Sequence, residues 1–84
     1  MLDVVFIWNE EPGGNVEHIA DNNLYPEDIE CAYETALRFG ISRSSGRQIF
    51  YGQAGDDSEI LVVYEELDAT TWYVVTAYRV GEEG

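Results

Sequence analysis

The chain has 84 residues and a mass of 9.5 kDa, which suits a single domain (residues 1–84), because a chain this short has only enough buried surface for one core. Its 13% aromatic content predicts a folded protein. The net charge is −13 and lysine is absent, which argues against general affinity for nucleic acids, since backbone phosphates must be neutralised by several Lys or Arg side chains.

The single cysteine and the apolar start of the chain exclude further kinds of site and of protein. Cys31 is the only cysteine, so an intrachain disulfide and a cysteine-rich zinc site are both excluded. The apolar stretch Leu2–Trp8 is too short to span a membrane and lacks a basic flank. We therefore expect a soluble cytoplasmic protein without membrane contact, and the sequence holds no cofactor or metal motif.

The first half of the chain predicts one strand and a short helix. Asp3–Trp8 is aromatic and β-branched without alternation, which favours a strand covered on both sides. A helix follows from Asn15 to about Asn22, with Asn15 as its N-cap. Asn15, His18 and Asn22 are expected on its outward face, where His18 is either a candidate acid–base group or a simple surface residue.

The pattern predicts a second, longer helix from Pro26 to Gly40. Proline suits the first helical position, and glycine suits the end. An apolar stripe supports this span and consists of Ile29, Ala32, Tyr33, Ala36 and Leu37. Glu34 and Arg38 have the spacing of a helical ion pair, and Cys31 lies opposite the stripe as a partly exposed residue.

Three strands are predicted in the second half, at Arg47–Tyr51, Ile60–Glu65 and Trp72–Val80. The connections are short and favour antiparallel neighbours, and the apolar run Ile60–Tyr64 suits a central strand. The predicted fold is therefore α+β: an N-terminal strand, then two helices packed on one face of a three-stranded antiparallel meander.

Two groups of residues are candidates for binding an anion. The loop residues Arg43, Ser44 and Ser45 could hold a phosphate through hydroxyls and a guanidinium, or they could form a simple polar loop. Arg79 is a charge on an otherwise apolar strand, and if Arg47 lies nearby the two would form a cationic pocket. The alternative is that each arginine pairs with a surface carboxylate.

Short motifs between Trp8 and Val80 carry a family resemblance through their order and spacing. They are Trp8-Asn9, Asn22-Asn23-Leu24 with Pro26-Glu27-Asp28-Ile29, Arg47 to Gly52, Ile60 to Tyr64, and Thr76-Ala77-Tyr78-Arg79. On these motifs the chain resembles the BrnT toxin family, whose fold is similar to that of RelE-type bacterial ribonuclease toxins.

The resemblance implies a type II toxin that cleaves RNA and is neutralised by an antitoxin partner. It assigns catalytic roles to Arg47, Arg79 and Tyr78. The chain departs from the family at Asn22 and Tyr78, where the family has His and Arg, and it lacks the family's other basic residues. We therefore expect RNA binding to be weak and activity to be reduced, lost or redirected. The alternative from a different class is a noncatalytic acidic module that binds a basic protein.

Overall fold

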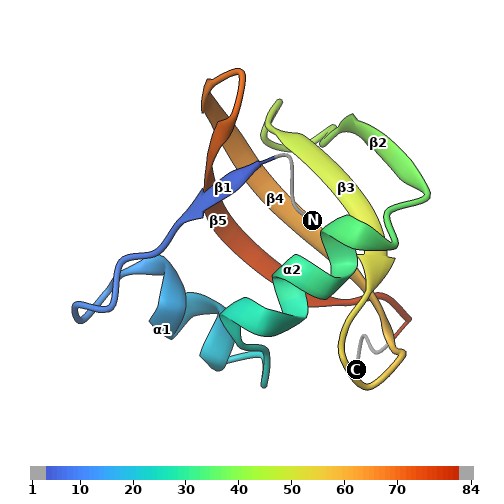
Figure 1. Ribbon diagram of the computed structural model, residues 1–84, viewed down its shortest axis with the longest axis horizontal. Helices are drawn as coiled ribbons and strands as arrows, with labels where there is room; N and C mark the ends of the chain where they lie inside the picture. Colours follow the sequence, from blue (N-terminus) through green and yellow to red (C-terminus); the bar gives the residue numbers. More distant parts are fainter. Residues whose placement is uncertain (1–3, 82–84) are drawn as a thin grey trace.

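The computed structural model describes residues 4–81, which form an α+β fold (Figure 1). Within these residues there are two helices, α1 (Asn15–Ala20) and α2 (Pro26–Glu34). The five strands of the same region are β1 (Val5–Ile7), β2 (Arg38–Ile41), β3 (Gln48–Gln53), β4 (Glu59–Asp68) and β5 (Thr71–Arg79). Neither of these helices has the length and apolar character that crossing a bilayer requires.

The strands join in one mixed sheet in the order β1-β5-β4-β3-β2. The predicted antiparallel meander corresponds to β3, β4 and β5, and the apolar run Ile60–Tyr64 lies in β4 at the centre of the sheet. The sheet is nevertheless larger than the predicted three strands, because β1 and β2 add one strand to each side. The prediction of an α+β fold is confirmed, whereas the three-stranded sheet is wrong.

The strand β2 replaces the predicted second half of the long helix. The helix ends at Glu34, and the Thr35 hydroxyl accepts a hydrogen bond of 2.9 Å from the backbone N–H of Gln53 in β3. Three residues later, β2 begins to pair with β3, and Phe39 lies opposite Phe50. This long-range pairing outweighs the local helical spacing of the apolar residues.

The strand β1 lies at an edge of the sheet and is not covered on both sides as predicted. Phe6 is buried in the core, but Val5 and Ile7 on either side of it are exposed. β1 pairs only with β5, and in parallel, because the chain returns through both helices and the rest of the sheet before reaching its partner.

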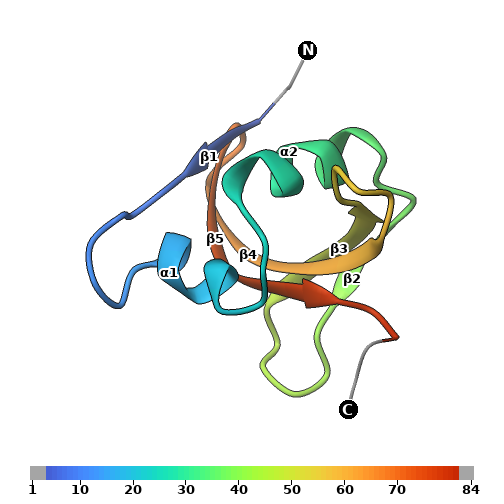
Figure 2. The same cartoon turned by 90° about the horizontal axis from the view of Figure 1, so that it is seen from below.

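The sheet curls around α2, as the second view shows (Figure 2). The curl brings the Phe39 ring of β2 to 6.5 Å from the Trp72 ring of β5, although β3 and β4 lie between these strands. The ring of Tyr33 in α2 lies edge-on to the Trp72 ring with 5.4 Å between the ring centres, and the Tyr64 ring stacks on Trp72 with 4.2 Å between the centres. One aromatic cluster thus joins the helix to the concave face of the sheet.

Two asparagines hold the part of β5 that β1 does not cover. Asn15 is buried, and its side-chain amide donates to the carbonyls of Ile7 (2.9 Å) and Val74 (2.8 Å). Its side-chain oxygen accepts from the N–H of Asn9 at 2.7 Å, and Asn22 donates to Ala77 of β5 at 2.8 Å. The prediction of Asn15 as an outward-facing N-cap is wrong: the N-cap is Gly14, and Asn15 bonds strand carbonyls.

Candidate functional site

Arg79 lies at the end of β5 and points to the helix-covered face of the sheet. It pairs with Ile60 of β4, which is fully buried on that face, and only 16% of its side chain is exposed. The guanidinium donates to the backbone carbonyls of Asn22 (2.9 Å) and Asn23 (3.4 Å) after α1. It also donates to the Ser58 hydroxyl at 3.2 Å.

An ion pair completes the surroundings of Arg79. Asp56 in the loop between β3 and β4 accepts from Nη2 at 3.2 Å. The pKa of Asp56 is lowered to about 2, first by hydrogen bonds from the Ser58 hydroxyl and backbone N–H and then by Arg79. Arg79 therefore connects the end of β5 to two loops, and most of its donors are already used.

Arg47 lies on the other face of the sheet, so the expected cationic pocket of Arg47 and Arg79 does not form. Gln48 pairs with Tyr64, which is buried on the helix side, and side chains alternate along a strand, which sends Arg47 to the opposite face. There its Nε donates to Glu65 at 3.1 Å. Each arginine thus pairs with a carboxylate, as the alternative reading of the sequence stated.

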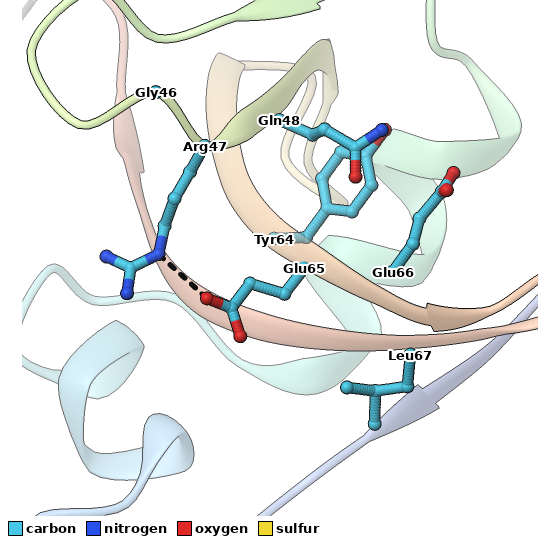
Figure 3. Close-up of a pocket in the computed structure, with 7 residues that line it drawn as sticks. All are labelled: Gly46, Arg47, Gln48, Tyr64, Glu65, Glu66 and Leu67. Atoms are coloured by element: carbon cyan, nitrogen blue, oxygen red, sulfur yellow. Dashed lines mark hydrogen bonds and ion pairs between the residues drawn. The ribbon is translucent and has the colours of Figure 1, made fainter.

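A shallow cavity of about 330 Å³ lies beside Arg47 (Figure 3). Arg47 reaches toward Glu65, whereas Gln48, Tyr64 and Glu66 lie together on the other side of the strands. Burial of the Tyr64 side chain raises the pKa of its hydroxyl, and the negative charge of Glu66 raises this pKa further. With two glutamates in its lining, this cavity repels rather than attracts a phosphate.

Tyr78 precedes Arg79 and points to the opposite face of β5, where it is exposed. Even so, both residues line a cavity of about 250 Å³ at the end of the strand, together with Asp21, Asn22 and Asn23. Tyr78 and Arg79, two of the residues that the family resemblance assigns to catalysis, thus border one cavity from opposite faces of the strand.

His18 is not part of this cavity. It lies exposed in the last turn of α1, and its side chain has no hydrogen-bond or ion-pair partner within residues 4–81. The outward position predicted for His18 is confirmed. No acid orients its ring by a hydrogen bond or an ion pair in the described region.

The serine-rich loop forms the turn between β2 and β3. The Ser42 hydroxyl lies 3.2 Å from that of Ser44 and accepts from the N–H of Ser45 at 3.4 Å. The Ser45 hydroxyl accepts from the N–H of Arg47 at 3.2 Å. These hydroxyls stabilise the turn itself, and Arg43 extends from it into solvent.

Sequence reasoning missed the acidic side of the molecule. Once α2 is known to end at Glu34, Glu27, Glu30 and Glu34 follow the i, i+3, i+7 spacing and form one stripe along it. We call these three residues the α2 acidic stripe. The spacing of these glutamates in the sequence contains this signal.

Arg38 is not the ionic partner of the α2 acidic stripe. The predicted pair with Glu34 is wrong, because Arg38 belongs to β2 and not to the helix. Its guanidinium lies 4.2 Å from the ring centre of Tyr51 and 3.4 Å from Glu59, on the face of the sheet away from α2. In residues 4–81, the α2 acidic stripe has no ion pair with any arginine.

No cluster of three or more metal-ligating side chains occurs between residues 4 and 81. Comparison of the chain with protein-family models, curated proteins and solved structures finds no match.

Proposed function

We propose that the chain is a noncatalytic interaction module that binds a basic protein partner. The observation that carries the proposal is the distribution of charge over the fold. Three of the arginines pair with carboxylates of the sheet and its loops, namely Arg38, Arg47 and Arg79. The α2 acidic stripe has no such compensation in the described region.

The overall charge acts in the same direction. A net charge of −13 on 84 residues produces a negative field that accelerates encounter with a cationic surface and repels a polyanion. The arginines expected to bind a phosphate backbone lie on opposite faces of the sheet and are neutralised. Binding to a basic protein therefore needs no rearrangement of these ion pairs, whereas binding to RNA does.

Charge-neutralising variants test the proposal. The double variant Glu27→Gln/Glu30→Gln removes two charges of the α2 acidic stripe, and Glu10→Gln/Glu11→Gln removes the same charge from the loop before α1. A lysine-rich peptide is titrated into each variant at low and high ionic strength. We expect the α2 variant to bind about fivefold more weakly than wild type, since exposed ion pairs contribute about 0.5 kcal/mol each.

The control variant separates a binding face from nonspecific attraction. It is expected to change affinity less than the α2 variant does. Equal losses in both variants, or binding by the wild type that does not weaken with salt, would contradict the proposal.

RNA cleavage by a BrnT-like toxin is the second candidate, and the cavity shared by Tyr78 and Arg79 favours it. An Arg79→Ala variant is ambiguous, because this side chain connects two loops to β5. Tyr78→Phe is the cleaner variant, since Tyr78 is exposed and makes no side-chain hydrogen bond within residues 4–81. RNA cleavage by the wild type that is lost in Tyr78→Phe would support this candidate, and wild-type inactivity both on RNA and in a growth-arrest assay would reject it.

A further inference from the structure

The edge strand β2 exposes an apolar surface that the rest of the molecule leaves open. All four of its residues are exposed, including Phe39 (57%) and Ile41 (60%), and Leu37 just before it is 86% exposed. The side chains of Phe39 and Ile41 lie on the same side of the strand, because they are two residues apart in it. Phe39 is also in contact with the aromatic cluster, 5.7 Å from the Phe50 ring.

The backbone of β2 is free to pair on its outer side. The N–H of Ser42 donates to the carbonyl of Arg47 at 2.7 Å and extends the β2–β3 register by one residue. Paired residues alternate between bonded and non-bonded in an antiparallel ladder. The N–H and C=O groups of Phe39 and Ile41 therefore point away from β3, toward the open edge.

Three common protections of an edge strand are missing from β2, although the strand has only four residues. Such strands are commonly blocked by lysine, proline or a bulge, and β2 contains none of these. Its single charge, Arg38, is paired with Glu59 and lies over Tyr51 on the other face. The strand thus presents an unblocked edge whose own charge is neutralised.

We infer that β2 is the docking strand for an extended segment of the basic partner, which adds to the sheet as a further strand. This inference rests on the proposed function and assigns it a location. Apolar side chains of the segment cover Phe39 and Ile41 on the helix side of the sheet. Lysine or arginine at its alternate positions faces the opposite side, where Glu59 and Glu65 lie beside Arg38 and Arg47. Glu34, at the end of α2, is an exposed carboxylate three residues before Leu37 in the chain.

Charge decides between this partner and a second copy of the chain. Two copies paired through β2 would each carry −13, so self-association works against strong repulsion. A cationic segment gains the same backbone hydrogen bonds and is attracted by the net charge of −13, which outweighs the exposed Arg43 in the turn after β2. The occupant is therefore a basic segment, and self-pairing is an outcome that the experiment detects.

Two substitutions at Ile41 separate backbone pairing from apolar contact. Ile41→Pro removes the outward N–H and blocks strand addition, while the ladder to β3 keeps its bonds. Ile41→Ala removes most of the side chain but keeps the N–H. The probe is an acetylated peptide of alternating lysine and valine, with a control peptide of the same composition in which the lysines and valines form separate blocks.

We expect the alternating peptide to bind the wild type at low ionic strength and to slow amide hydrogen exchange at Phe39 and Ile41. Ile41→Pro should weaken this binding about tenfold, and Ile41→Ala about threefold or less, since each lost backbone hydrogen bond changes affinity by up to about an order of magnitude. The blocked peptide should bind Ile41→Pro and wild type equally. Unchanged near-UV circular dichroism of both variants confirms that they fold.

The possible failures are distinguishable. If neither peptide binds at low ionic strength, the proposed function and the docking strand are both refuted. If the alternating peptide binds Ile41→Pro as well as wild type, the docking strand alone is refuted. Sedimentation showing that the wild type dimerises as salt rises, and that Ile41→Pro does not, would assign β2 to self-association and overturn the basic partner.

Discussion

Replacing Asn15 by leucine tests the most consequential polar contact of the fold. Leucine has the same branching and the same number of side-chain heavy atoms as asparagine, so Asn15→Leu removes the side-chain hydrogen bonds while the side chain keeps its shape. The variant leaves the carbonyls of Ile7 and Val74 and the N–H of Asn9 without their present partner. These groups lie where β1 separates from β5, so the contact fixes the spacing of those strands.

The expected loss of stability follows from the surroundings of the three groups. The bond to Val74 is buried, and an unpaired buried carbonyl costs about 1–3 kcal/mol. The bonds to Ile7 and Asn9 are partly buried, and each contributes roughly 0.5–1.5 kcal/mol. The total is about 4 kcal/mol, which for a domain of this size lowers Tm by more than about 16 °C.

Urea unfolding followed by tryptophan fluorescence measures this loss. The matched control is Asn22→Leu, which removes one hydrogen bond to β5 from an exposed residue and should cost about 1 kcal/mol. A loss below about 1 kcal/mol for Asn15→Leu, or equal losses for the two variants, would refute the role assigned to Asn15.

Two further predictions concern the packing of α2 and the acid stability of the fold. Gly52→Ala should destabilise the protein by about 3 kcal/mol or prevent folding, because an added Cβ collides with a backbone carbonyl of α2, whereas Gly40→Ala, with open space around it, should change stability by less than about 0.5 kcal/mol in the same urea assay. The pKa of Asp56 is lowered to about 2 in the folded protein by Ser58 and then by Arg79, so its contribution to stability is complete above its ordinary pKa near 3.8 and is lost as pH falls through about 2. Asp56→Asn should therefore flatten the fall in Tm between about pH 4 and pH 2, and a wild-type slope in this variant would contradict the assignment.

The antiparallel meander was predictable from the chain because its signals are local. Alternating and continuously apolar runs separated by short turn segments define β3, β4 and β5 without knowledge of the rest of the fold. The start of α2 at Pro26 was predictable for the same reason. The boundaries of the strands shifted by one to three residues, since pairing partners set them.

The candidate site was less predictable. Arg79 was correctly singled out as a charge that needs a partner, but its partners come from loops that are distant in sequence. Arg47 does not lie beside Arg79 as expected, because a shift of one residue along a strand moves a side chain to the other face of the sheet. His18 lies exposed as expected, but its chemistry depends on neighbours that sequence spacing does not supply.

The sequence by itself determined the acidic character of the protein, the single cysteine and the elements with local patterns. Tertiary structure decided that residues after Glu34 form β2, because Phe39 gains more from pairing beside Phe50 than from one further helical turn. It also decided that the arginines separate and that Asn15 is buried. Each of these outcomes depends on the partner that a side chain meets across the sheet, and contacts between distant segments form only when the chain has folded.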